Sequence, residues 1–184
     1  MLIRLYCLAA LLALPCALSA TMAVKLDLST LTDKSELVVI AKLDSKSAKW
    51  NAAATGIWTH HSLTVSETLK GEHAASREFV TRGGVVGDRG QHVSGSGTFD
   101  IGNEYVFFLW KDDDGRYQLT GMVQGAFALC DDNGVRRAKN SFSGLSIVDA
   151  TTLKPVADKA PLDYTVADLK KAVAASNKAA KEQE

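Results

Sequence analysis

The four histidines carry the side chains that most readily do chemistry, because imidazole serves both as a metal ligand and as a general base. His60 and His61 are adjacent, and His73 and His92 lie in segments rich in small and polar residues. Neighbouring residues of a strand point to opposite faces, so one metal ion does not easily bind both His60 and His61. The chain also lacks HExxH and CxxC patterns. We therefore expect no metal site and no cofactor, with His60 and His61 as one residue on the sheet face and one on its rim.

A second group of side chains has the composition of a hydrolytic triad. Ser94 and Ser96 lie near His92 and Asp88 in the sequence. All four crowd one segment, whereas triad residues normally converge from separate rigid elements. Residues 95–97 read Gly-Ser-Gly, which does not extend to the Gly-x-Ser-x-Gly pattern of a nucleophile elbow. We expect no catalytic residues, and a weak hydrolase that uses His92 remains an alternative.

Two aspartate-rich stretches could suggest calcium binding. Residues 112–115 read Asp-Asp-Asp-Gly, and residues 131–134 read Asp-Asp-Asn-Gly. Calcium loops of the EF-hand type need alternating oxygen ligands and a distal bidentate Glu. Consecutive aspartates before a glycine, between two strands, are typical of hairpin turns. We therefore expect two turns here rather than two calcium loops.

The glycine-rich segment of residues 83–97 is the best candidate for a binding surface, and we call it the rim segment. It lacks the Gly-Lys-Ser/Thr ending of a phosphate-binding loop and does not open a helix. Glycine is disfavoured in regular elements, so we expect irregular backbone or a wide hairpin. Loops on a rigid scaffold often carry binding. The candidate binding residues are Gly83, Gly84, Asp88, Arg89, Gln91 and His92.

The first twenty residues have the layout of a secretory signal peptide, with a short basic start, an apolar run and a small-residue exit at Ser19 and Ala20. The run covers residues 5–18, which is shorter than the roughly 20 residues that cross a bilayer. Cys16 lies near the end of this run, but the proline before it is a poor fit to lipoprotein processing. We expect an exported protein, periplasmic or secreted, without a lipid anchor or a transmembrane segment.

Composition limits the remaining chain further. Residues 21–184 carry 20 basic and 21 acidic side chains, because Arg4 leaves with the signal, and no basic stripe is present. We therefore expect no nucleic-acid partner. Cys130 is the only cysteine left, so no internal disulfide can form. Its place near a turn leaves partial exposure open, although a lone thiol is more often a small buried group.

Apolar patterning outlines the elements that hold these side chains. Short strands with frequent turns indicate a small barrel or sandwich. Strands are predicted over residues 37–43, 57–69, 77–82, 104–110, 117–120, 125–130 and 135–138. A helical turn is predicted within residues 24–35, a loop over 44–55, a C-terminal helix over 166–178 capped by Thr165, and a frayed tail after it. The three tryptophans are predicted to be mostly core, and Phe107 and Phe108 to face opposite sides of one strand.

Two short motifs carry a resemblance to a known family. Residues 69–71 read Leu-Lys-Gly at the end of a strand, and residues 99–105 read Phe-Asp-Ile-Gly-Asn-Glu-Tyr before another. With the strand order, they resemble the netrin-like domain, the OB-type barrel of tissue inhibitors of metalloproteinases. The chain also resembles a group of uncharacterised exported bacterial proteins. The resemblance implies an OB-like barrel. Together with the pattern of elements, it leads us to expect a mainly β, five- to seven-stranded OB-like barrel domain over residues 21–160, which begins with the short helical turn, and a C-terminal helix and frayed tail over residues 161–184.

The resemblance does not transfer an activity. Metalloproteinase inhibitors of this family chelate the protease zinc through an N-terminal cysteine, and no cysteine lies near Thr21. We therefore expect a non-enzymatic exported module that binds a protein partner through the rim segment. An envelope or secreted metalloprotease inhibitor without the cysteine wedge is the first alternative, and a weak hydrolase is the second.

Overall fold

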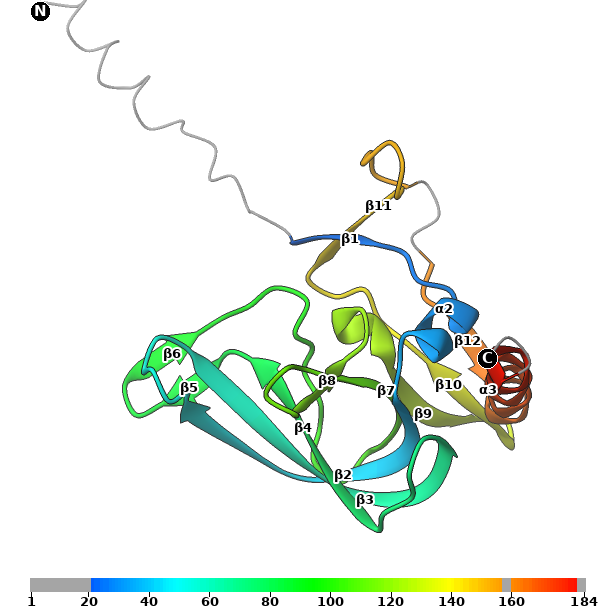
Figure 1. Ribbon diagram of the computed structural model, residues 1–184, viewed down its shortest axis with the longest axis horizontal. Helices are drawn as coiled ribbons and strands as arrows, with labels where there is room; N and C mark the ends of the chain where they lie inside the picture. Colours follow the sequence, from blue (N-terminus) through cyan, green and yellow to red (C-terminus); the bar gives the residue numbers. More distant parts are fainter. Residues whose placement is uncertain (1–20, 157–159, 182–184) are drawn as a thin grey trace, which may run out of the picture.

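The computed structural model describes residues 21–156 and 160–181, which form a mainly β structure with one short and one longer helix (Figure 1). The expected signal peptide, with Cys16, lies outside the described residues. The helices are α2 (Leu28–Asp33) and α3 (Val166–Lys181), with a 3-10 helix η2 (Met122–Gly125). The strands are β1 (Thr21–Val24), β2 (Leu37–Trp50), β3 (Ile57–Lys70), β4 (Ser76–Arg82), β5 (Gly84–Val86), β6 (Arg89–Gln91), β7 (Glu104–Lys111), β8 (Tyr117–Leu119), β9 (Ala126–Asp132), β10 (Val135–Lys139), β11 (Leu145–Val148) and β12 (Asp163–Thr165).

Five strands close into a ring, as the prediction of a small OB-like barrel requires. The main sheet has the order β12-β10-β9-β7-β2-β3-β4-β8, and an additional pairing joins β8 back to β7. The ring is therefore β7-β2-β3-β4-β8, closed by a parallel bridge between Val80 and Gln118. The five strands of the ring agree with the five to seven predicted for the barrel, and β9, β10 and β12 extend the sheet from β7 outside the ring to eight strands.

The prediction of a loop over residues 44–55 is wrong for most of that segment. Strand β2 continues to Trp50 and pairs with β3 in a long hairpin, with register shifts between Leu43 and Ser45 and at two earlier points. Pairing with β7 on the other edge ends at Lys42. The polar composition of the outer half therefore reflects a two-stranded ribbon open to solvent, which sequence composition alone does not distinguish from a loop.

Two apolar cores lie on opposite faces of the sheet. The inner core fills the barrel, and the outer core lies under α2 and α3 (Figure 1). Phe107 belongs to the inner core and Phe108 to the outer one, which confirms that these neighbours face opposite sides. Helix α3 contributes Val166, Leu169 and Val173 to the cover over Phe108. The C-terminal helix is thus part of the fold.

The predicted cap of the C-terminal helix and the two predicted hairpin turns are confirmed. Thr165 Oγ1 accepts a hydrogen bond from the Asp168 amide at 3.1 Å and donates to the Asp168 carboxylate at 2.7 Å, which caps α3. Asn133 and Gly134 both have positive φ, as the tight turn between β9 and β10 requires. In the other hairpin, the Asp112 carboxylate accepts bonds from the Arg116 amide and from Gln118. These contacts are those of a turn.

The prediction for the tryptophans is wrong in two of three cases. Trp50 and Trp110 are 41% and 38% exposed, because Trp50 lies at the open end of the β2–β3 ribbon and Trp110 faces outward at the end of β7. Trp58 is half-buried between two guanidinium groups, those of Arg82 and Arg116. Cys130 is exposed, since it lies beyond the part of β9 that pairs with β7.

Strand β1, which the sequence did not suggest, pairs with a strand more than a hundred residues later in the chain. Strand β1 pairs in parallel with β11, and α2 follows it within residues 24–35, where a short helical turn was predicted. Gln124 holds this arm in place: its Oε1 accepts from the Leu26 amide, and its Nε2 donates to Val24 O. Asn140 Nδ2 in turn donates to the main-chain oxygen of Gln124. Gln124 and Asn140 are both buried and form a closed polar network.

Candidate functional site

A pocket of about 380 Å³ lies where the rim segment crosses the open end of the barrel. It is bounded by the β2–β3 ribbon, the end of β4, the hairpin of β5 and β6, and the loop that follows β10. Its lining residues are Lys46, Thr59, His61, Thr81, Arg82, Gly83, Gly84, Gln91, His92, Val93, Gly95, Ser96, Gly97, Thr98, Phe99, Val123, Ser141, Ser143 and Gly144. The volume is within the range of small-ligand sites.

The pocket brings together four of the six predicted binding residues. Gly83, Gly84, Gln91 and His92 all line it. Asp88 and Arg89 do not, because β5 and β6 form a tight hairpin whose tip carries these two exposed residues away from the barrel. The rim segment therefore contains a narrow hairpin followed by an irregular stretch, and the irregular stretch is the part that closes the pocket.

Glycine is required at two of the predicted positions because the backbone passes close to the barrel. A Cβ atom on Gly84 would lie 2.6 Å from Thr59 Oγ1 and 2.9 Å from the Cβ of Ala48. A Cβ atom on Gly83 would lie 2.8 Å from the main-chain oxygen of Gln91. Both glycines also have positive φ. These contacts press the hairpin against β2 and β3, so Gly83 and Gly84 shape the pocket wall.

His61 is the buried polar residue of the pocket. It is 3% exposed, and its ring stacks on Phe79 with centroids 4.5 Å apart. Its Nε2 lies 2.9 Å from Thr81 Oγ1, whereas its Nδ1 is buried without a hydrogen-bond partner. Burial, with the nearby charges of Lys46 and His60, lowers the pKa of His61 to about 4. The imidazole is therefore neutral at pH 7, with one ring nitrogen unsatisfied.

The two adjacent histidines do face opposite sides, as expected. His60 points outward, where its Nδ1 lies 2.8 Å from the Glu78 carboxylate. His61 points inward with Leu63 and Val65, which are also buried. This alternation was readable in the sequence and could have assigned His61 to the interior. The rim segment, however, gave no sign that it folds over His61.

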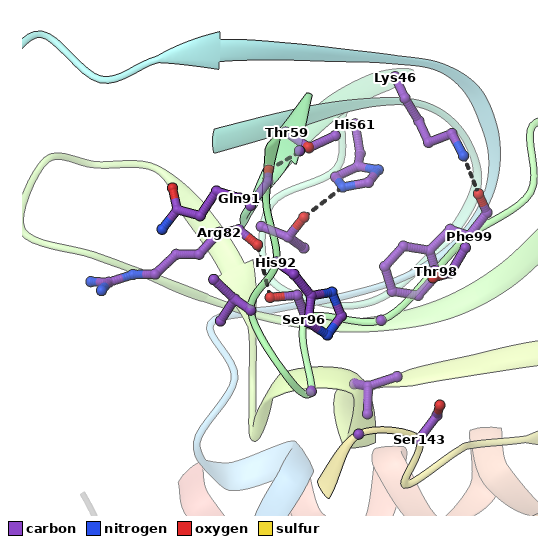
Figure 2. A pocket seen from close by; sticks show the side chains of 18 of the residues that line it. Lys46, Thr59, His61, Arg82, Gln91, His92, Ser96, Thr98, Phe99 and Ser143 are labelled. Atoms are coloured by element: carbon purple, nitrogen blue, oxygen red, sulfur yellow. Dashed lines mark hydrogen bonds between the residues drawn. The ribbon is translucent and has the colours of Figure 1, made fainter. Parts of the chain in front are cut away.

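The hydrolytic arrangement considered above is not assembled. Ser96 Oγ donates to Arg82 O at 2.8 Å, so its hydroxyl is bonded to a main-chain oxygen rather than to an imidazole. Ser94 is not among the lining residues, and Asp88 lies at the hairpin tip. Figure 2 shows His92 and His61 facing the pocket from different elements, with Ser96 beside His92. No carboxylate lines the pocket to orient either imidazole.

Two cationic side chains border the pocket on opposite sides. Figure 2 shows Lys46 beside Phe99 on one side and Arg82 beside Gln91 on the other. Lys46 Nζ donates to Phe99 O at 2.7 Å, and the Arg82 guanidinium lies 5.1 Å from the Trp58 ring. Neither has a carboxylate partner among residues 21–156 and 160–181. Sequence reasoning missed both, since Lys46 lay in the expected loop and Arg82 at a strand end.

A second, smaller pocket of about 270 Å³ adjoins the first. The two pockets share Thr81, Arg82, Val93 and Ser96. The rest of the second pocket is largely apolar, and it is lined by Val80, Trp110, Gln118, Leu119, Gly121 and Met122. The rim of the barrel thus presents a polar hollow with cations beside it and an apolar hollow next to Arg82.

The described part of the chain contains no group of three or more His, Cys, Asp or Glu side chains placed to hold a metal ion. None of its helices is long and apolar enough to cross a membrane. Comparison with protein-family models, with curated proteins and with solved structures found no match, so the site rests on its own geometry.

Proposed function

We propose that this chain is an exported, non-enzymatic module that binds a protein partner through the rim pocket. One observation carries the proposal: four of the six rim residues predicted from the sequence converge on one pocket together with the irregular stretch that follows them. A binding surface needs such a concave, pre-formed arrangement of polar groups on a rigid scaffold.

The absence of an assembled catalytic group favours binding over hydrolysis. A nucleophile needs a base within hydrogen-bond reach, and the base needs an orienting group. Ser96 is bonded to a main-chain oxygen, and His61 is bonded only to the Thr81 hydroxyl. The pocket lining offers no carboxylate for either role. No contact within the described residues favours inhibition of a metalloprotease.

Affinity capture tests the proposal. Residues 21–184 are immobilised and exposed to envelope and culture-supernatant extracts of the source cells. The rim variant His92→Ala/Ser143→Ala removes two exposed side chains that line the pocket. The control His73→Ala/Ser76→Ala removes the same residue types from exposed positions outside both pockets, in the turn before β4 and at the first residue of β4. We expect a stoichiometric protein that the rim variant loses and the control retains.

Three results would oppose the proposal. Equal retention by the rim variant and the control would place binding elsewhere on the surface. Release of a captured metalloprotease on addition of a chelator would favour the inhibitor alternative instead. Turnover of an ester substrate that disappears in His92→Ala would favour the hydrolase.

A further inference from the structure

We infer that the rim site recognises an extended acidic segment of a polypeptide, with an apolar side chain next to its carboxylates. This inference rests on the proposed function, because it names the chemistry of the partner at the same pocket. It follows from the charges around the pocket, from the unsatisfied imidazole inside it and from the apolar hollow beside it.

The charges around the site are of one sign. Lys46 and Arg82 line the larger pocket, and neither pocket has an aspartate or glutamate in its lining. The chain as a whole has equal numbers of acidic and basic residues, so this separation is local. A site edged by cations, with no carboxylate inside, favours a ligand that carries negative charge.

The cation that lines both pockets has room for a ligand. Arg116, which also contacts the Trp58 ring, is bonded to Asp112 and Asp114. Arg82 is exposed and contacts Trp58, and no carboxylate of the described residues pairs with it. A guanidinium presents several donors in one plane and binds carboxylates through two parallel hydrogen bonds. Arg82 is therefore the expected main anchor.

The positions of the two cations favour an extended ligand over a compact anion. Lys46 and Arg82 lie on opposite sides of the pocket, with His61 and His92 between them (Figure 2). We expect a phosphate or a single carboxylate to contact one of the two cations, whereas an extended peptide places the side chains of alternate residues on one side. Two glutamates two residues apart can then approach both cations. Thr98 and Ser143 also line the pocket.

The buried imidazole supplies a contact inside the pocket. His61 Nδ1 has no partner, although His61 is 3% exposed. A buried polar atom of this kind is costly unless something satisfies it. A polar group of a ligand that enters the pocket can do so. The adjoining hollow, lined by Trp110, Leu119 and Met122, fits an apolar side chain beside Arg82.

Blocked heptapeptides provide the test, measured by isothermal titration with residues 21–184. The acidic probe is acetyl-Ser-Glu-Thr-Glu-Thr-Leu-Ser-amide, and its control has glutamine in place of both glutamates. We expect the acidic probe to bind at least roughly tenfold more tightly, the effect of losing one good charge-assisted hydrogen bond. A third peptide with serine in place of leucine should also bind less tightly.

Matched variants locate the contact. Arg82→Gln and Lys46→Gln should each weaken the acidic probe severalfold. Arg89→Gln and Lys49→Gln are the controls, since both residues are exposed and neither lines a pocket. For the apolar hollow, Trp110→Ser should weaken the probe, and Trp50→Ser, at a similarly exposed tryptophan, should not. The His61 ring nitrogens should shift in the NMR spectrum on binding, while those of His73 stay unchanged.

Several outcomes would overturn the inference. Equal binding of the acidic and glutamine probes would contradict the recognition of an acidic peptide. Equal losses of affinity in Arg82→Gln and Arg89→Gln would contradict it as well. Displacement of the probe by inorganic phosphate would indicate a site for compact anions. Equally tight binding of a single-stranded DNA oligomer of the same charge would indicate a general polyanion surface. If affinity capture succeeds while the probes fail, the proposed function stands and only the partner's chemistry is wrong.

Discussion

Two buried polar side chains of this barrel differ in whether their polar atoms all have hydrogen-bond partners. Gln124 is 1% exposed, and its amide bonds the N-terminal arm through the Leu26 amide and Val24 O. His61 is 3% exposed, yet one of its ring nitrogens has no partner. The Gln124 amide is bonded to main-chain groups through both its oxygen and its nitrogen, whereas His61 lines a pocket. The comparison teaches that burial alone does not mark a site, but burial with an unsatisfied atom beside a pocket does.

Removal of residues 161–184 should lower the stability of the fold most, because it removes α3 and one partner of the buried Gln124–Asn140 network. Asn140 Oδ1 accepts from the Leu162 amide, and α3 covers the outer core with three buried apolar side chains. Uncovering that core should cost about 6 kcal/mol, at roughly 2 kcal/mol for each side chain, which is comparable with the total stability of a domain. Urea unfolding of residues 21–160 should show no cooperative transition. An unchanged midpoint would contradict the structural role of α3.

Replacement of Gln124 by leucine tests the same network at one point. The substitution leaves the Leu26 amide and Val24 O without their partners, while it keeps the side chain's size. We expect a loss of about 3 kcal/mol in the free energy of unfolding, because stranded buried polar groups are costly. The control Gln118→Leu, on the half-buried β8, should cost less. Equal losses would mean that the arm is not specifically held by Gln124.

The pH dependence of stability should report on His61. The pKa of His61 is about 4 in the folded chain and 6.5 when unperturbed. Between these values the unfolded chain binds a proton that the folded chain does not, so stability is full above pH 6.5 and falls towards pH 4. The expected loss between pH 7 and pH 5 is about 2 kcal/mol. His61→Phe should flatten this part of the curve, whereas His73→Phe, at an exposed histidine, should leave it unchanged.

The smallest change in stability should come from replacing His61 and Thr81 together. His61→Phe/Thr81→Val removes both partners of one hydrogen bond, together with the unpaired Nδ1, and keeps an aromatic ring stacked on Phe79. Removal of both partners of a buried bond can be nearly neutral. We expect a change within about 1 kcal/mol at pH 7, measured by urea unfolding. A loss as large as that of Gln124→Leu would show that His61 is a structural residue like Gln124.

The candidate site was predictable from the sequence only in part. Composition indicated the rim segment, and alternation in β3 was sufficient to turn His61 inward. The sequence did not indicate Lys46 as a site residue, because a polar two-stranded ribbon and a loop have the same composition. It did not indicate Ser143 either, because this residue comes from a loop far along the chain that reaches the rim only when the barrel is folded. Asp88 and Arg89 lie outside the pocket, because a tight hairpin turns them away from it.

The sequence by itself determined the features that depend on short-range interactions. The mainly β class, the Asn133–Gly134 turn, the Thr165 cap of α3 and the opposite directions of Phe107 and Phe108 follow from neighbours within a few residues. The tertiary structure decided the closure of the ring through Val80 and Gln118, the pairing of β1 with β11 and the assembly of the pocket. These contacts join residues far apart in the chain, and their free energy is gained only when the whole barrel closes.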